Sequence, residues 1–242
     1  MKIELFVTCL VDTLFPEVGE AVVELLEQCG VEVLFNESQT CCGQPPFNAG
    51  FTGEAKTIAE HMLDTYENSD EMLVIPSGSC TAMIRQSYSE LFQDDAHNLE
   101  RAKKLSERAI EFSEFMVDIL GKTQFPDAAN YPVAYHPSCH QLRELKTGDR
   151  PQILLAENFP GYQTLEEECC GFGGVFSIDQ PELSAEMLKR KIANIQANSP
   201  EAVIACDVSC LMQIEGSLRK AGSPIRCAHL AQALAGKPAG LR

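Results

Sequence analysis

Eleven cysteines are the residues of this 242-residue chain best suited to chemistry. Eight of them fall into two sets: a first set (Cys9, Cys41, Cys42, Cys80) and a second set (Cys139, Cys169, Cys170, Cys210). Positions 9 and 80 recur at an offset of 130 residues, and the adjacent pair followed by glycine recurs at an offset of 128. Self-similarity at a nearly fixed spacing indicates two copies of one structural unit.

Thiolates in groups of four are typical ligands of iron–sulfur clusters, so each set is predicted to bind one cluster, [4Fe–4S], in its own half of the chain. Both members of an adjacent pair would strain an ordinary cubane, which points to an unusual cluster. Structural zinc is the less favoured alternative, because its cysteines usually come as two closely spaced pairs. Buried cysteines acting as small hydrophobes are a further alternative, but the repeated adjacent pair argues against it.

The remaining three cysteines are Cys29, Cys206 and Cys227. Cys29 lies on the apolar stripe of a predicted helix, and Cys227 follows a predicted edge strand at 224–226, so both are expected in the core. Cys206 is a possible fifth ligand of the second set, although a buried strand residue is the favoured interpretation.

Several other residues near the second set could influence its chemistry. The segment Gly171–Gly174 lacks the spacing of a dinucleotide fingerprint; its backbone N–H groups could bond cluster sulfides or an anion, or its glycines could simply form a turn. Cys139 is flanked by four residues that could supply positive charge: His136, His140, Arg143 and Lys146. They could raise a cluster's potential or bind an anionic partner group, but such histidines are more often surface or capping residues. The run Glu166–Glu168 is most simply a solvated loop.

Each copy reads as alternating strands and helices. Short apolar strands are predicted at 3–7, 31–35 and 72–75 in the first copy, and at 133–135, 163–165 and 202–205 in the second. This alternation predicts an α/β fold of two pseudo-equivalent, doubly wound, parallel-sheet (Rossmann-like) halves. Cysteines follow each strand within a few residues, so both sets should gather beyond the carboxyl ends of the strands.

The helix pattern places the boundary between the halves near residue 128, giving domains 1–127 and 128–242. One helix starts near Pro16 and ends at Gly30, and another covers about 54–66. A long amphipathic helix at about 97–120 should connect the halves. In the second half, Asp179–Glu182 reads as a capping box that opens a helix with proline in its first turn. The buried stripe of that helix is expected to be Ala185, Leu188, Ile192 and Ile195.

Composition excludes several function classes. A formal charge of −16 argues against nucleic-acid binding, which needs clustered Lys and Arg. No apolar run approaches the ~20 residues of a membrane span, so direct membrane insertion is not expected. An acidic residue interrupts the N-terminal apolar segment, unlike a signal peptide. We therefore predict a cytoplasmic protein, where cysteines of this kind are more often metal ligands or catalytic thiols than disulfides.

The motifs Cys41-Cys42-Gly43-Gln44-Pro45 and Cys169–Gly174, with Cys9, Cys80, Cys139 and Cys210, resemble the tandem cysteine-rich CCG domains. That family includes the cysteine-rich component of heterodisulfide reductase, the iron–sulfur components of glycolate and glycerol-3-phosphate oxidases, and lactate-utilisation proteins of the LutA type, which the chain resembles most. The resemblance spans nearly the whole chain.

The resemblance implies an electron-transfer subunit of an L-lactate (2-hydroxy acid) oxidation complex, without activity on its own. Its partners would be a ferredoxin-like iron–sulfur protein (LutB-like) and a third protein (LutC-like), through which it could associate with the membrane. Heterodisulfide reductase ends its motif in C-x-x-C and holds non-cubane clusters through five cysteines, whereas Ser77 and Asp207 stand at the penultimate position here. This departure argues against disulfide-reducing chemistry. Two alternative functions stay open: a thiol/disulfide oxidoreductase and a zinc-stabilised assembly scaffold.

Overall fold

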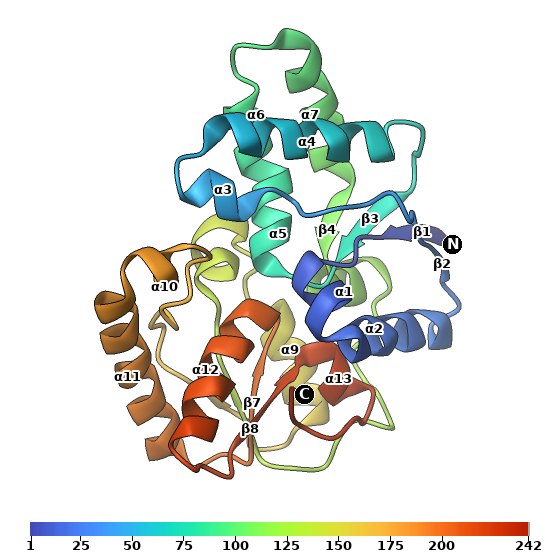
Figure 1. Cartoon of the computed structure of the whole chain (residues 1–242). Coiled ribbons are helices and arrows are strands. Elements are labelled where there is room, and N and C mark those ends of the chain that lie inside the picture. The colour runs from blue at the N-terminus through green and yellow to red at the C-terminus, as the bar shows by residue number, and fades with distance from the viewer. Residues whose placement is uncertain (242) are drawn as a thin grey trace.

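The computed structural model describes residues 1–241 and contains two four-stranded sheets in which every pairing is parallel (Figure 1). The strand orders are β2-β1-β3-β4 and β6-β5-β7-β8, the same topology twice. The strands are β1 (Lys2–Leu5), β2 (Glu32–Leu34), β3 (Met72–Ile75), β4 (Ala109–Glu111), β5 (Val133–Tyr135), β6 (Gln163–Thr164), β7 (Ala202–Ala205) and β8 (Arg226–His229). The predicted α/β fold of two pseudo-equivalent, doubly wound halves is thereby confirmed.

Helices connect the strands on both faces of each sheet, as right-handed parallel crossovers require. Those of the first half are α1 (Cys9–Leu14), α2 (Pro16–Gln28), α3 (Gln44–Asn48), α4 (Thr52–Tyr66), α5 (Gly78–Ala82), the π-helical turn η1 (Met83–Ser87), α6 (Tyr88–Leu91), α7 (Ala96–Arg108), α8 (Phe112–Glu114) and the π-helical turn η2 (Phe115–Ile119). Those of the second half are the π-helical turn η3 (Gln141–Leu145), α9 (Arg150–Asn158), α10 (Phe176–Asp179), α11 (Pro181–Asn198), α12 (Val208–Lys220) and α13 (Leu230–Leu234).

The predicted connecting helix at 97–120 is wrong, because β4 interrupts it. Ala109 adopts extended backbone angles, and the segment pairs with β3 in the register Leu73↔Ala109 and Ile75↔Glu111. The apolar positions of α7 and of the segments after β4 happen to continue one helical spacing. Pairing with the free edge of β3, which the local pattern does not reveal, breaks the helix at this point.

Two smaller expectations in the second half are also wrong. The edge strand lies at Arg226–His229 and not at 224–226, because it pairs with the whole of β7 in the register Ala202↔Arg226. The expected capping box is absent: Gln180 is the residue before α11, and it makes no side-chain cap hydrogen bond. Pro181 nevertheless occupies the first turn. The expected stripe holds for Ile192 and Ile195, whereas Ala185 is exposed and Leu188 half-buried.

The two halves share one hydrophobic core built from both sheets and from helices of both halves. Helix α2 of the first half contacts α13 of the second (Figure 1). Helix α8 of the first half likewise contacts α9 of the second, and the duplication relates these two helix pairs to each other. The boundary at residue 128 stays a prediction. Within residues 1–241, no helix is both long enough and apolar enough to cross a bilayer.

Candidate functional site

The eight predicted ligand cysteines lie where the strands end. Cys9 opens α1 directly after β1, the pair Cys41–Cys42 lies between β2 and α3, and Cys80 lies in α5 after β3. The second set occupies the equivalent places after β5, β6 and β7, with Cys210 in the first turn of α12. Both sets therefore sit at the carboxyl edge of a parallel sheet, where ligands bind in folds of this kind.

Each set forms a continuous series of sulfur contacts. In the first, the Cys9 and Cys41 sulfur atoms are 3.7 Å apart, and the Cys42 thiol is in hydrogen-bonding contact with both Cys41 and Cys80. In the second, Cys169 contacts Cys139 and Cys170, and Cys170 also contacts Cys210. The structure thus brings together all four thiols in each half. The members Cys42, Cys80, Cys170 and Cys210 are buried, whereas Cys9, Cys41, Cys139 and Cys169 are half-buried.

One cysteine of each set has a depressed pKa. The thiols of Cys42 and Cys9 donate to Cys41, and the Gly43 N–H lies 3.4 Å from its sulfur, so the pKa of Cys41 falls well below its usual range. Cys139 and Cys170 lower the pKa of Cys169 in the same way, assisted by the N–H of Gly171 at 3.4 Å. In each set, one cysteine thus favours the deprotonated thiolate, the form of cysteine that binds metals.

The glycine after each cysteine pair is required by its geometry. Gly43 and Gly171 have φ of +85° and +83°, a region that disfavours side chains. A Cβ at Gly171 would lie 2.6 Å from the Ser184 carbonyl oxygen of α11. In the following segment, Gly173 and Gly174 also have positive φ. Both interpretations of Gly171–Gly174 thus hold in part, since it supplies an N–H donor to a thiolate and forms a turn.

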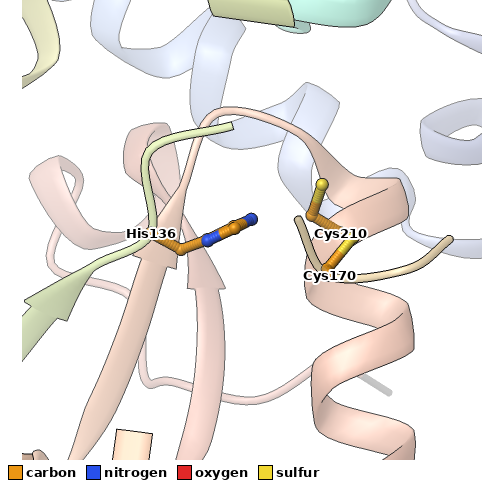
Figure 2. Close-up of side chains that lie close together, drawn as sticks. All are labelled: His136, Cys170 and Cys210. Atoms are coloured by element: carbon orange, nitrogen blue, oxygen red, sulfur yellow. The ribbon is translucent and has the colours of Figure 1, made fainter. Parts of the chain in front are cut away.

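The second set has a more polar surrounding than the first. His136 is 1% exposed, and neither of its ring nitrogens has a hydrogen-bond partner. Figure 2 shows its ring extending toward Cys170 and Cys210, and the three ligand atoms lie within 4.8 Å of one another. Burial lowers the pKa of His136 to about 3, so the ring is neutral at pH 7.

The other residues predicted beside Cys139 are less involved. His140 places Nδ1 3.7 Å from the Cys139 sulfur and Nε2 2.9 Å from Gln44 Nε2 of the first half. Arg143 and Lys146 are exposed, as are Glu166 and Glu167 in the acidic loop.

Lys191 of α11 is a buried cation that sequence reasoning missed. Its Nζ donates to the Glu166 carbonyl oxygen at 2.5 Å, and burial lowers its pKa although Cys170 and Cys210 favour its charge. The sequence did offer a signal of its burial, because Lys191 follows Leu188 by three positions and so lies on the apolar stripe of the helix. The carbonyls of Ala55 and Ser184 pack on Gly43 and Gly171, so these two carbonyls occupy equivalent places at an offset of 129 residues. At the same offset, the first-half residue equivalent to Lys191 is Met62.

Ser77 and Asp207, which depart from the C-x-x-C pattern, bind each other across the two halves. Ser77 Oγ donates to Asp207 Oδ1 at 2.8 Å, and the Ser79 N–H donates to the same oxygen at 2.9 Å. Ser138 Oγ donates to Asp207 Oδ2 at 2.5 Å. Burial opposes ionisation, but the nearby His140 and these hydrogen bonds hold the pKa of Asp207 below its ordinary value. The carboxylate therefore links the halves and has both oxygens occupied.

Of the three remaining cysteines, Cys206 and Cys227 lie in the hydrophobic core and Cys29 is half-buried against it. Cys206 is buried in the core shared by both halves and contacts Tyr135 and Gln141 there, whereas the second set borders another part of the core. Cys29 ends α2 and packs against the shared core. Cys227 is buried within β8.

Comparison with protein families identifies the duplicated unit. The model of the cysteine-rich CCG domain matches the chain twice, at residues 3–85 and 133–215. The chain belongs to the CCG family. It is 41% identical over 239 residues to lactate utilization protein A 2 of Bacillus cereus (strain Q1), covering 97% of this chain and 98% of that protein. It is 45% identical over 240 residues to lactate utilization protein A of Exiguobacterium sp. (strain ATCC BAA-1283 / AT1b), covering 96% of each. The fold similarity to solved structures is low, as for glutamate racemase from Campylobacter jejuni, with a TM-score of 0.36 at 15% identity over 97% of this chain.

The donors present fit an iron–sulfur group. Each set offers four contacting thiols, one of them with a depressed pKa, together with a backbone N–H directed at sulfur. Four thiolates are the usual ligand set of such clusters, and N–H donors to sulfur tune their potential.

Proposed function

We propose that this chain is the iron–sulfur electron-transfer subunit of an L-lactate (2-hydroxy acid) oxidation system. The first set would hold one [4Fe–4S] cluster, here the first centre, and the second set would hold another, the second centre. Such clusters supply one-electron transfer, which suits a component between a two-electron oxidation and its acceptor. The chain's own residues bind the clusters, exclude water from their buried side and direct N–H groups at sulfur.

The observation that carries the proposal is the repeated meeting of four thiols at the carboxyl edge of each sheet. The full-length similarity to proteins named for lactate utilization supports the choice of pathway. A second candidate, thiol/disulfide exchange, is favoured by the depressed pKa of Cys41 and Cys169, because a thiolate is the attacking species in that reaction.

The partners proposed are a ferredoxin-like iron–sulfur protein and a third, LutC-like protein, in the cytoplasm, with the membrane reached only through partners. The strongly acidic chain, at −16, should meet basic patches on these proteins. Surface electrostatics are screened by salt, so binding should weaken as ionic strength rises.

Cofactor content is the first test. Protein reconstituted anaerobically with iron and sulfide should be brown and carry roughly eight iron atoms per chain, four in each half. Cys42→Ser and Cys170→Ser should each remove one centre and leave the other visible by spectroscopy. Stoichiometric zinc without acid-labile sulfide would contradict the proposal and favour an assembly scaffold.

Activity is the second test. The reconstituted chain is mixed with L-lactate and an artificial electron acceptor, first alone and then with the two candidate partners. We expect no turnover from the chain alone, and lactate-dependent loss of visible absorption only in the complete mixture. Robust lactate oxidation by the isolated chain would contradict the relay function, and disulfide reduction by it would favour the thiol-redox candidate.

A further inference from the structure

The imidazole of His136 is a potential metal ligand without a partner. It is buried, both ring nitrogens lack a hydrogen-bond partner among the described residues, and the ring extends toward Cys170 and Cys210 (Figure 2). A buried polar group without a hydrogen-bond partner destabilises the folded state. The arrangement is therefore explained best by a bound group that the ring itself contacts.

The duplication supplies an internal comparison for this position. The N–H of Phe6 donates to the Val74 carbonyl at 3.0 Å, and the N–H of His136 donates to the Ile204 carbonyl at 2.8 Å. Both donors and acceptors are related by the offset of 130, so Phe6 and His136 occupy the same place in the two sheets. Phe6 packs among the buried cysteines of the first set, as part of an apolar cluster. The fold therefore accepts an aromatic hydrocarbon here, and the histidine is not required for packing.

The two buried charged side chains near the second set, Asp207 and Lys191, are already engaged. Asp207 uses both carboxylate oxygens to accept from Ser77, Ser79 and Ser138. The Lys191 ammonium donates to a backbone carbonyl and, being a cation, is no metal ligand while protonated. Among the described residues, His136 is thus a buried group near the second set that is both a suitable ligand and unpartnered.

We propose that the His136 imidazole is a ligand of the second centre in place of one thiolate of the second set, whereas the first centre is held by thiolates alone. The inference rests on the proposed iron–sulfur function. Replacing a thiolate ligand by a neutral imidazole raises the reduction potential of an iron–sulfur centre. The second centre should therefore have a higher potential than the first.

The test is nitrogen hyperfine spectroscopy on the full chain, reconstituted anaerobically with iron and sulfide and reduced to a paramagnetic state. Protein grown with ¹⁵N-histidine should show the coupling of a directly bound imidazole nitrogen, and natural-abundance protein should show the corresponding ¹⁴N coupling. The coupling should vanish in His136→Phe, which copies the first half, and persist in the control His140→Phe. His136→Cys should supply a thiolate in place of the imidazole, remove the coupling and lower the potential of the second centre.

The possible outcomes separate the two proposals. Protein that binds no iron would overturn the proposed function before this inference is reached. Protein that carries both centres but shows no bound-imidazole coupling would overturn the inference alone, as would an unchanged coupling in His136→Phe. Should the His136→Phe variant fail to fold, the ¹⁵N coupling in the labelled wild-type chain still tests whether a histidine nitrogen binds the centre.

Discussion

Asp207 joins the two halves through a buried carboxylate, and its removal is the most direct test of how they are held together. Three donors from two segments, one in each half, converge on it: Ser77 Oγ, the Ser79 N–H and Ser138 Oγ. Asp207→Ala would remove the acceptor that these three donors share and leave the Ser79 N–H unpaired. Ser77 Oγ would keep only Ser79 Oγ as an acceptor, at 3.1 Å, and Ser138 Oγ would keep only Gln141 Oε1, at 3.4 Å. We therefore expect a large loss of stability from a substitution that alters neither sheet nor cysteine set.

The magnitude follows from the bonds removed. Hydrogen bonds to a charged acceptor are worth about 1.5–3 kcal/mol each, so the three together contribute very roughly 4–9 kcal/mol. The variant also avoids burying a charge, which costs several kcal/mol. The difference predicts that Asp207→Ala lowers the free energy of unfolding by about 3 kcal/mol. Ser77→Ala, which removes one of the three bonds to Asp207, should cost about 1–2 kcal/mol.

The assay is urea denaturation of the reduced chain under anaerobic conditions, followed by circular dichroism. A double-mutant cycle with Ser77→Ala and Asp207→Ala should give a coupling energy of about 1–2 kcal/mol, because the two side chains share one bond. The exposed residue Asp179 provides the control, since Asp179→Ala should change stability by less than about 0.5 kcal/mol.

A loss below about 0.5 kcal/mol for Asp207→Ala would refute this reasoning. It would mean that the shared apolar core holds the halves together and that the carboxylate contributes almost nothing to the free energy of unfolding. A coupling energy near zero, with each single substitution strongly destabilising, would instead show that Ser77 and Asp207 act through different contacts.

Three further predictions concern a buried carboxyl group, the core cysteines and the glycine beside the second set. Burial raises the pKa of Glu111 to about 8, from about 4.3 in an unfolded chain. Between these two pH values the folded state binds a proton that the unfolded state has lost, so the free energy of unfolding should fall as pH rises from about 4.3 to about 8. Glu111→Gln should flatten that slope in urea titrations at several pH values; an unchanged slope would contradict this. Cys29→Ala and Cys227→Ala should keep the full iron content and lose only stability, whereas loss of a cluster signal would show that either cysteine is a ligand. Gly171→Ala should disorder the second centre and reduce iron toward roughly four atoms per chain, and full iron content would refute the steric argument.

Much of the fold could be predicted because its strands are short buried apolar runs bounded by turn residues. The strands β3, β5 and β7 have the predicted bounds, and all three are central strands followed by site cysteines. The strand β4 could not be predicted, because its three residues continue the periodicity of the helix before it. Only the free edge of β3, contributed by a segment about 35 residues earlier, makes it a strand.

The cysteine sets could be predicted from spacing, because backbone topology alone delivers the ends of neighbouring parallel strands to one edge. Contacts between the halves could not. The bond from Ser77 to Asp207 joins positions 130 residues apart, and it depends on how two sheets pack. The orientation of His136 likewise depends on the side chains around it, which is why a sequence pattern ranks it no higher than a surface histidine.

The duplication explains where the two centres should differ. The sulfur positions are kept in both halves, so they define what the sites share. The first set is enclosed by apolar side chains such as Phe6 and Met62, whereas the second has the neutral imidazole of His136 and the buried cation of Lys191. A neutral ligand and a nearby positive charge both favour the reduced, more negative form of a cluster, so they act in the same direction. With clusters bound as proposed, the second centre would have the higher potential, and electrons would pass preferentially from the first centre to the second.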